Sequence, residues 1–139
     1  MKPCPDAEHG HCYINARNHP DGKPVNGWMF WERKKAFVEA EAHCVVELPD
    51  GSLIDNTPKP DGEKQILFLA DPDLETPDDG EMGPANRRLL ICDDRMMRDW
   101  LELAEKRDAI MRNVYEGNDA QSVLMEFMMS NNQVMMRFP

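Results

Sequence analysis

The chain has 139 residues, enough for one domain with a hydrophobic core and too few for two ordinary ones. Hydrophobic residues make up 41% and charged residues 30%, which is typical of a folded protein rather than a disordered one. Twenty-six acidic residues against sixteen lysines and arginines give a net charge of −10, which repels phosphate backbones and anionic lipid surfaces. We therefore expect no nucleic-acid partner and no membrane partner.

The sequence also bears on the location of the protein and on the redox state of its cysteines. No apolar run approaches the ~18 residues that cross a bilayer, and the N-terminus lacks the basic-then-apolar layout of a signal peptide. The sequence therefore predicts a cytoplasmic protein. Its four cysteines are scattered along the chain, so we expect reduced thiols rather than a disulfide framework. They are Cys4, Cys12, Cys44 and Cys92.

The first half of the chain has the pattern of a β-rich segment. Residues 12–18 form a predicted short helix, which the proline and glycine of 19–22 stop. Residues 27–32 are aromatic-rich and typical of a strand. Residues 37–48 alternate with period two, which predicts a strand with one apolar face and one mostly polar, solvated face. The solvated face carries Glu39, Glu41 and Glu47.

Pro49, Asp50 and Gly51 favour a turn that returns the chain as a partner strand over 52–56. Residues 66–70 are a continuous apolar run, which predicts a buried strand. Residues 71–84 are acidic and rich in proline and glycine, which predicts an exposed loop.

Helical patterns dominate the rest of the chain. After a short strand over 87–92, Asp93 or Asp94 caps a predicted helix that runs to about residue 116 and stops at Gly117. A last helix is predicted from about 119 to 129. The tail is rich in methionine, which packs adaptably both in cores and in contacts with a protein partner or a second copy of the chain.

These elements predict a single α+β domain over residues 1–139. A small antiparallel sheet packs against the short N-terminal helix and the C-terminal helices. The β-rich half covers about 1–70, the acidic loop 71–84 and the helical half 85–139.

The turn chemistry places two polar residues of the hairpin together. A three-residue loop with glycine at its bulge sets Val45 opposite Asp55 and His43 opposite Thr57. His43 and Asp55 then share a face as diagonal neighbours, roughly 7 to 8 Å apart at the backbone. A two-residue loop would put them on opposite faces. A carboxylate beside a histidine fixes its tautomer and stabilises the imidazolium, which is how a nucleophile is activated.

Cys12 is the best candidate for that nucleophile. It opens the first predicted helix, where the helix dipole and free N–H groups lower the pKa of a thiol and can stabilise an oxyanion. Gly10 allows close approach of a substrate to the backbone. Cys44 points away from His43 by strand alternation, whereas Cys92, just before the long helix, stays an alternative nucleophile.

Three short motifs stand in this order: "GHC" at 10–12, "HCVVE" at 43–47 and "DNT" at 55–57. Together they resemble the Gly-x-Cys, His-x-x-x-Glu and Asp-x-Thr pattern of the transglutaminase-like branch of the papain-like cysteine peptidase superfamily. The resemblance covers residues 10–58. It implies a papain-like fold.

The resemblance also implies a peptidase, amidase or transglutaminase-like acyltransferase with a protein or peptide substrate and no cofactor. In that reaction Cys12 attacks an acyl group, His43 shuttles the proton and Asp55 orients His43. Trp28 or Trp31 would line the substrate cleft. Both also fit an aromatic core strand.

Two other functions remain open. Cys4, His9, His11 and Cys12 lie close together in the sequence and are residue types that bind zinc, although no Cys-x-x-Cys pair is present. A small zinc-binding protein is therefore one alternative. The other is a non-catalytic interaction module on the same scaffold, which presents its acidic surface and methionine-rich C-terminal helices to a protein partner.

Overall fold

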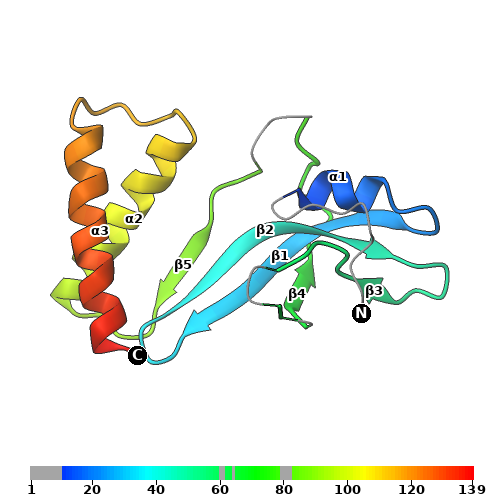
Figure 1. Cartoon of the computed structure of the whole chain (residues 1–139), viewed down its shortest axis with the longest axis horizontal. Helices are drawn as coiled ribbons and strands as arrows, with labels where there is room; N and C mark the ends of the chain where they lie inside the picture. Colours follow the sequence, from blue (N-terminus) through cyan, green and yellow to red (C-terminus); the bar gives the residue numbers. More distant parts are fainter. Residues whose placement is uncertain (1–10, 60–61, 64, 79–82) are drawn as a thin grey trace. The chain divides into compact units, whose positions relative to one another are not determined.

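The structure, a computed structural model, describes residues 11–59, 62–63, 65–78 and 83–139. It has the predicted α+β fold, with an antiparallel sheet, a short N-terminal helix and two C-terminal helices (Figure 1). The strand order is β3-β2-β1-β4, and β5 pairs with β2 as well. The elements are α1 (Cys12–Arg17), β1 (Lys23–Arg33), β2 (Phe37–Glu47), β3 (Leu53–Ile54), β4 (Leu67–Ala70), β5 (Arg87–Leu90), α2 (Arg95–Met111) and α3 (Ala120–Arg137).

The fold divides into two compact units, and the long strands β1 and β2 run through both. The first unit comprises the described parts of 1–30 and 41–84, with α1, β3 and β4. The second comprises 31–40 and 85–139, with β5, α2 and α3. A single domain over the whole chain stays a prediction.

The hairpin of β2 and β3 has the predicted register. Val46 stands opposite Ile54, and the Leu48 N–H donates to the Ser52 carbonyl at 2.9 Å. Gly51 has a φ of +83°, the left-handed conformation that glycine adopts without steric cost. The predicted turn chemistry is therefore confirmed, and Val45 comes opposite Asp55.

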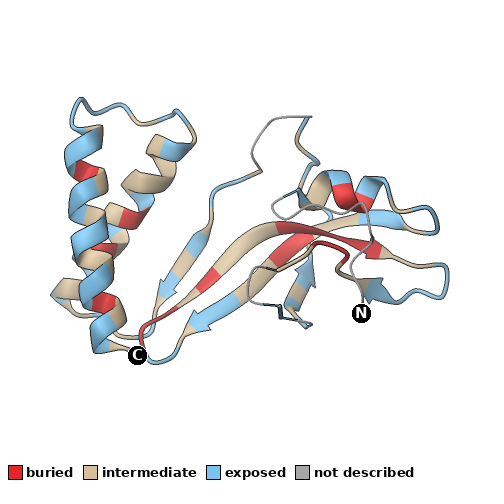
Figure 2. Ribbon diagram, in the orientation of Figure 1, coloured by how far each residue is buried: buried red, intermediate tan, exposed pale blue. Residues whose placement is uncertain are grey.

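The burial of β2 differs from the predicted pattern of one apolar and one solvated face. Every residue from His43 to Val46 is buried, so both faces of this part of the strand are covered (Figure 2). The prediction of a solvated glutamate face is wrong for Glu39, which is 5% exposed. The alternation of residue types shows which residues share a face of the strand, but it does not show whether that face is exposed. A charged residue can be buried when a neighbouring element supplies a partner for its charge.

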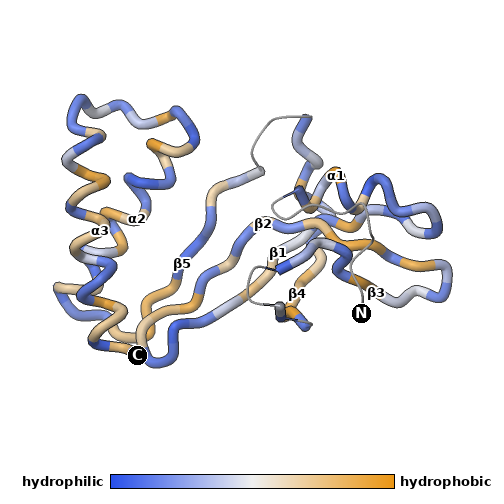
Figure 3. The backbone as a smooth tube through the Cα atoms, viewed as in Figure 1, coloured by the Kyte–Doolittle hydropathy of each residue, from blue (hydrophilic) through white to orange (hydrophobic). Residues whose placement is uncertain are grey.

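The apolar run at 66–70 forms strand β4, and the prediction that this strand is buried is wrong. β4 pairs with β1 at the end of the strand order, and Leu67 and Leu69 are 70% and 60% exposed. The segment is hydrophobic in Figure 3 and mostly exposed in Figure 2. A short apolar run has the same sequence pattern in a central strand and in an edge strand.

Both long helices differ from their predicted ends. Asp94 caps α2, because its Oδ1 accepts the Met97 N–H at 3.0 Å. The helix ends at Met111, before the predicted end, because Asn113 takes a left-handed φ of +58° and the Val114 N–H returns to the Ala109 carbonyl. In contrast, α3 continues through the methionine-rich tail to Arg137. No helix within the described residues has the length and apolar character to cross a bilayer.

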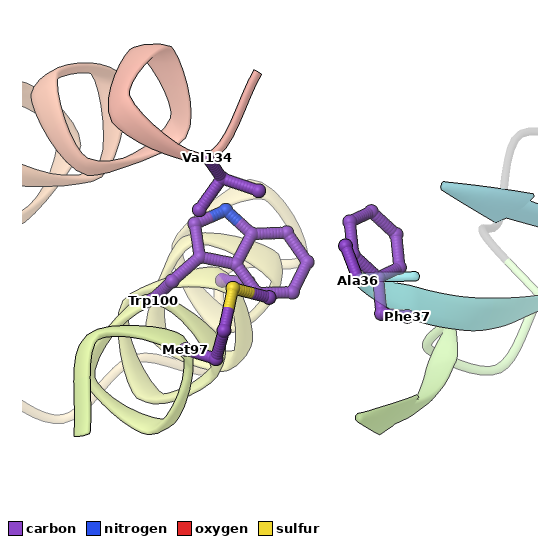
Figure 4. Packing of buried hydrophobic residues seen from close by; sticks show 6 residues of the cluster. Ala36, Phe37, Met97, Trp100 and Val134 are labelled. Atoms are coloured by element: carbon purple, nitrogen blue, oxygen red, sulfur yellow. The ribbon is translucent and has the colours of Figure 1, made fainter. Parts of the chain in front are cut away.

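Trp100 of α2 is at the centre of the hydrophobic core of the second unit. It is 2% exposed, and its ring centroid lies 4.4 Å from that of Phe37 on β2. Its indole N–H donates to Asn131 Oδ1 of α3 at 3.1 Å, which joins the two helices. Figure 4 shows Met97 and Val134 against the indole. This packing holds α2, α3 and the start of β2 together.

A buried network of charges in the second unit explains the burial of Glu39. The Arg88 guanidinium of β5 donates to the Glu39 carboxylate and, at 2.7 Å, to Asp108 of α2. Asn86 adds a hydrogen bond to Glu39 at 3.3 Å. Burial raises the pKa of Glu39, and the charge of Arg88 opposes that rise. Arg88 thus bridges two carboxylates that are largely removed from water.

Replacing Arg88 tests this network. Arg88→Met leaves Glu39 and Asp108 without their shared cation, so we expect the free energy of unfolding to fall by about 3 kcal/mol. Chemical denaturation measures it. The matched control is Arg95→Met, which breaks the solvent-exposed pair with Asp99 and should cost below about 0.5 kcal/mol. Equal losses in the two variants would contradict a structural role for the network.

Candidate functional site

The hairpin brings His43 and Asp55 into direct contact. His43 Nε2 lies 3.0 Å from Asp55 Oδ2, and His43 is 4% exposed. The other carboxylate oxygen, Oδ1, accepts the Thr57 N–H at 3.1 Å, which fixes the orientation of Asp55. The sequence prediction that His43 and Asp55 share a face is confirmed.

Lys59 is a third member of this cluster, and sequence reasoning missed it. Its Nζ lies 2.8 Å from Asp55 Oδ2 and 3.4 Å from His43 Nε2. The side chains of Lys59 and Asp55 are each 13% exposed. Lys59 follows Asp55 by four residues, but it lies in an irregular segment. Outside a helix or a strand, the spacing in the sequence does not determine which way a side chain points.

Cys12 reaches the same cluster from α1. Its side chain lies close enough to His43 to raise the pKa of the imidazole, and it packs beside the hydrophobic cluster of Ala16, Cys44 and Val46. Cys12 is the first residue of α1, as predicted. The structure therefore brings together all three residues of the predicted triad.

Two side-chain hydrogen bonds hold α1 in front of the hairpin. Asn56 donates to the Asn15 backbone carbonyl at 2.8 Å, and Asn15 donates to Thr57 Oγ1 at 3.2 Å. All three residues are buried. Sequence reasoning missed Asn15, although its position three residues after Cys12 puts both on neighbouring parts of one helix face. The "DNT" segment thus orients His43 through Asp55 and anchors α1 through Asn56 and Thr57.

The contacts among these groups shift their protonation. Burial lowers the pKa of His43, but hydrogen bonds and charge from Asp55 and Cys12 outweigh it and raise that pKa to about 9. Burial raises the pKa of Asp55, but His43, Lys59 and the Thr57 N–H together hold it below its usual value. The two groups therefore favour an imidazolium facing a carboxylate near neutral pH.

The neighbouring thiol Cys44 has a different environment. It is completely buried, and burial, with the charge of Cys12, raises the pKa of Cys44 to about 12. Burial and the charge of Cys12 also raise the pKa of Tyr13 to about 12. Cys44 is therefore an inert thiol that belongs to the packing under α1.

The two tryptophans and Cys92 lie apart from the contact between His43 and Asp55. Gly10 lies outside the described residues. Trp28 is 5% exposed and donates its indole N–H to Asp71 Oδ2 at 3.0 Å. Trp31 is 44% exposed and belongs to the second unit, where its ring packs edge-on against Phe37. Cys92 also belongs to the second unit, with its Sγ 3.5 Å from an Arg137 nitrogen. A cleft role for the tryptophans stays a prediction.

The zinc alternative concerns partly undescribed residues. Cys4 and His9 lie outside the described part of the chain, whereas His11 is exposed and Cys12 contacts His43. In the described ranges, no three side chains of histidine, cysteine, aspartate or glutamate are arranged to hold a metal ion. Zinc binding by the N-terminal residues stays a prediction.

No family model, curated protein or solved structure matches the chain. The resemblance to the transglutaminase-like branch therefore rests on the three motifs at 10–58.

The protonation of His43 predicts a pH dependence of stability. The pKa of His43 is raised to about 9 in the folded state, whereas it is near 6.5 in the unfolded chain. Protonation of His43 therefore contributes fully to the free energy of unfolding below pH 6.5, and this contribution is lost as the pH rises through 9. His43→Gln should remove a slope of up to about 1.4 kcal/mol per pH unit in this window. Denaturation at several pH values measures it, and His19→Gln controls for loss of an imidazole elsewhere. An unchanged slope in His43→Gln would contradict the raised pKa.

Proposed function

We propose that the protein is a thiol-dependent hydrolase or acyltransferase of papain-like type, with Cys12, His43 and Asp55 as its triad. One observation carries the proposal: a buried histidine contacts a carboxylate at 3.0 Å, and a cysteine at the start of α1 lies close enough to raise the pKa of the same imidazole. A cysteine is nucleophilic as the thiolate, and an adjacent imidazolium stabilises that form. The motif resemblance supports the same assignment.

The geometry supports a division of roles. Asp55 occupies Nε2 of His43, so proton exchange with Cys12 belongs to the other ring nitrogen, Nδ1. The Cys12 thiolate attacks the carbonyl carbon of an amide, ester or thioester. The bond to the leaving group breaks, and the imidazolium of His43 gives that group its proton. Asp55 stays ionised throughout and fixes the tautomer and the ring orientation.

The second half of the reaction reuses the same groups. A water molecule or an amine attacks the acyl-thioester on Cys12, and His43 accepts the proton of the attacking group. The carbon–sulfur bond then breaks and regenerates the Cys12 thiolate. The proposed acyl donor is a protein or a peptide, and these steps require no cofactor.

Alkylation of Cys12 tests the proposal. At pH 6 an ordinary thiol is below about 1% thiolate, so an activated Cys12 should react with iodoacetamide at least about tenfold faster than a free thiol. Peptide mapping by mass spectrometry assigns the modified residue, with the buried Cys44 and the half-buried Cys92 as internal references. His43→Ala should reduce the rate to that of a free thiol, because it removes the imidazolium.

Two controls accompany this measurement. His19→Ala removes a histidine that accepts the Asp21 N–H in the turn after α1, and it should leave the alkylation rate unchanged. Asp55→Asn should give an intermediate rate, because His43 keeps a hydrogen-bond partner but loses the charge that stabilises its imidazolium. If wild-type Cys12 reacts no faster than a free thiol, the triad proposal is wrong.

A specific observation favours a second candidate function, a non-catalytic interaction module. Helix α3 exposes four methionines by 61% to 83%, and Glu126 is its only charged residue between Ala120 and Arg137. An exposed apolar helix face with so little charge is suited to contact with another protein. The methionines are Met125, Met128, Met129 and Met136.

Self-association through α3 provides a direct test of this second function. Sedimentation of the wild type should show a concentration-dependent dimer, and the double variant Met128→Glu, Met129→Glu should be monomeric because it places four like charges in the contact. The control Leu67→Glu places a charge on an exposed apolar side chain of β4, in the other unit, and should leave the association unchanged. A dimer combined with an ordinary Cys12 rate would favour the interaction module. A monomeric wild type would contradict self-association.

A further inference from the structure

We propose that Lys59 is a positioning residue that weakens the hold of Asp55 on the His43 proton and so lowers the pH at which His43 releases it. This inference rests on the proposed function, because it assigns Lys59 a part in the proton transfer between His43 and the leaving group. Lys59 stands outside the three sequence motifs and outside the predicted triad.

The geometry is that of one oxygen shared by two donors. Asp55 Oδ2 lies 3.0 Å from His43 Nε2 and 2.8 Å from Lys59 Nζ. The ammonium also lies 3.4 Å from the same ring nitrogen. His43 and Lys59 both draw on the negative charge of Asp55 Oδ2, so the bond that each forms to this oxygen weakens the bond formed by the other. Lys59 is therefore placed to compete with the imidazolium for Asp55.

Direct charge repulsion acts in the same direction. An ammonium at this distance from a ring nitrogen disfavours a second positive charge on that ring. The cluster is little exposed to water, with His43, Asp55 and Lys59 exposed by 5%, 13% and 13% in their side chains, so screening by solvent is limited. Removal of the Lys59 charge should therefore increase the affinity of His43 for its proton.

The other charged and titratable groups around His43 define the environment of this effect. Cys12 approaches from α1 and Asp55 from the end of the hairpin, and both favour the imidazolium. Glu41 shares the His43 face of β2 by strand alternation. Lys59 places a positive charge against these negative groups, 3.4 Å from His43 Nε2.

Loss of Lys59 should leave Asp55 in place. The second carboxylate oxygen, Oδ1, is held by the Thr57 N–H at 3.1 Å, and Thr57 is itself anchored to Asn15 of α1. The expected effect of removing Lys59 is therefore a change of charge at His43 rather than a collapse of the cluster.

The consequence for the reaction concerns the step in which the imidazolium gives up its proton. With a pKa raised to about 9, His43 binds its proton tightly at neutral pH, which slows donation to a leaving group. A cation that competes for Asp55 eases that donation, because it reduces the stability of the imidazolium. Lys59 thus shifts the acid strength of His43 toward neutral pH.

Titration of the His43 ring by NMR, with labelled histidine, tests the proposal in the full chain. Lys59→Met should raise the proton affinity of His43 by about tenfold, which is one pH unit, whereas Lys59→Arg keeps the charge and should change it by less than about twofold. The matched control is Lys23→Met, which removes an exposed lysine of β1. That lysine pairs with Glu47 of β2, the strand that carries His43, and its loss should leave the His43 titration unchanged.

The outcomes separate this inference from the proposed function. An unchanged or lowered His43 midpoint in Lys59→Met overturns the role of Lys59, even where Cys12 proves reactive. An ordinary alkylation rate of wild-type Cys12 overturns the proposed function, while the His43 titration still decides whether Lys59 opposes protonation. The same spectra report whether the variants are folded, and Lys59→Gln serves as the neutral variant where Lys59→Met is unfolded.

Discussion

The turn at residues 49–51 determines which side chains of the first unit meet. Gly51 in its left-handed conformation closes a three-residue loop, which sets Val46 opposite Ile54. Because side chains alternate along a strand, a slip of one residue would move Asp55 to the face away from His43. The contact between His43 and Asp55, the position of Lys59 and the anchoring of α1 through Asn56 and Thr57 all depend on this register.

Each unit contains a buried cluster of charges, and the two clusters have opposite arrangements. In the second unit one cation, Arg88, lies between the carboxylates of Glu39 and Asp108. In the first, one carboxylate, Asp55, lies between the donors of His43 and Lys59. Removing charges from water is costly, so both clusters persist only because their members pair. Of these two clusters, the one around Asp55 contains an imidazole, which can gain and lose a proton, whereas Arg88 stays protonated.

Much of the hairpin and part of the candidate site follow from the sequence, because local rules govern them. Turn residues set the register of β2 and β3, and Asp94 caps α2 as its residue type predicts. Burial does not follow in the same way, since it depends on elements distant in the sequence. Glu39 is buried because Arg88 approaches it from β5, and Leu67 is exposed because β4 lies at the end of the strand order. Lys59 escaped prediction for a related reason, because its direction is set by an irregular segment rather than by a helix or strand.

The short length of α1 links the position of Cys12 to the segment after β3. A helix of six residues has too few internal hydrogen bonds to be stable alone, so its place depends on packing and on outside hydrogen bonds. Asn56 donates one of those bonds to the Asn15 carbonyl, and Thr57 accepts the other from the Asn15 side chain. Both residues directly follow the aspartate that contacts His43. The same few residues therefore set both the orientation of the imidazole and the location of the thiol. A substitution in this segment is therefore expected to disturb the orientation of His43 and the position of Cys12 at the same time.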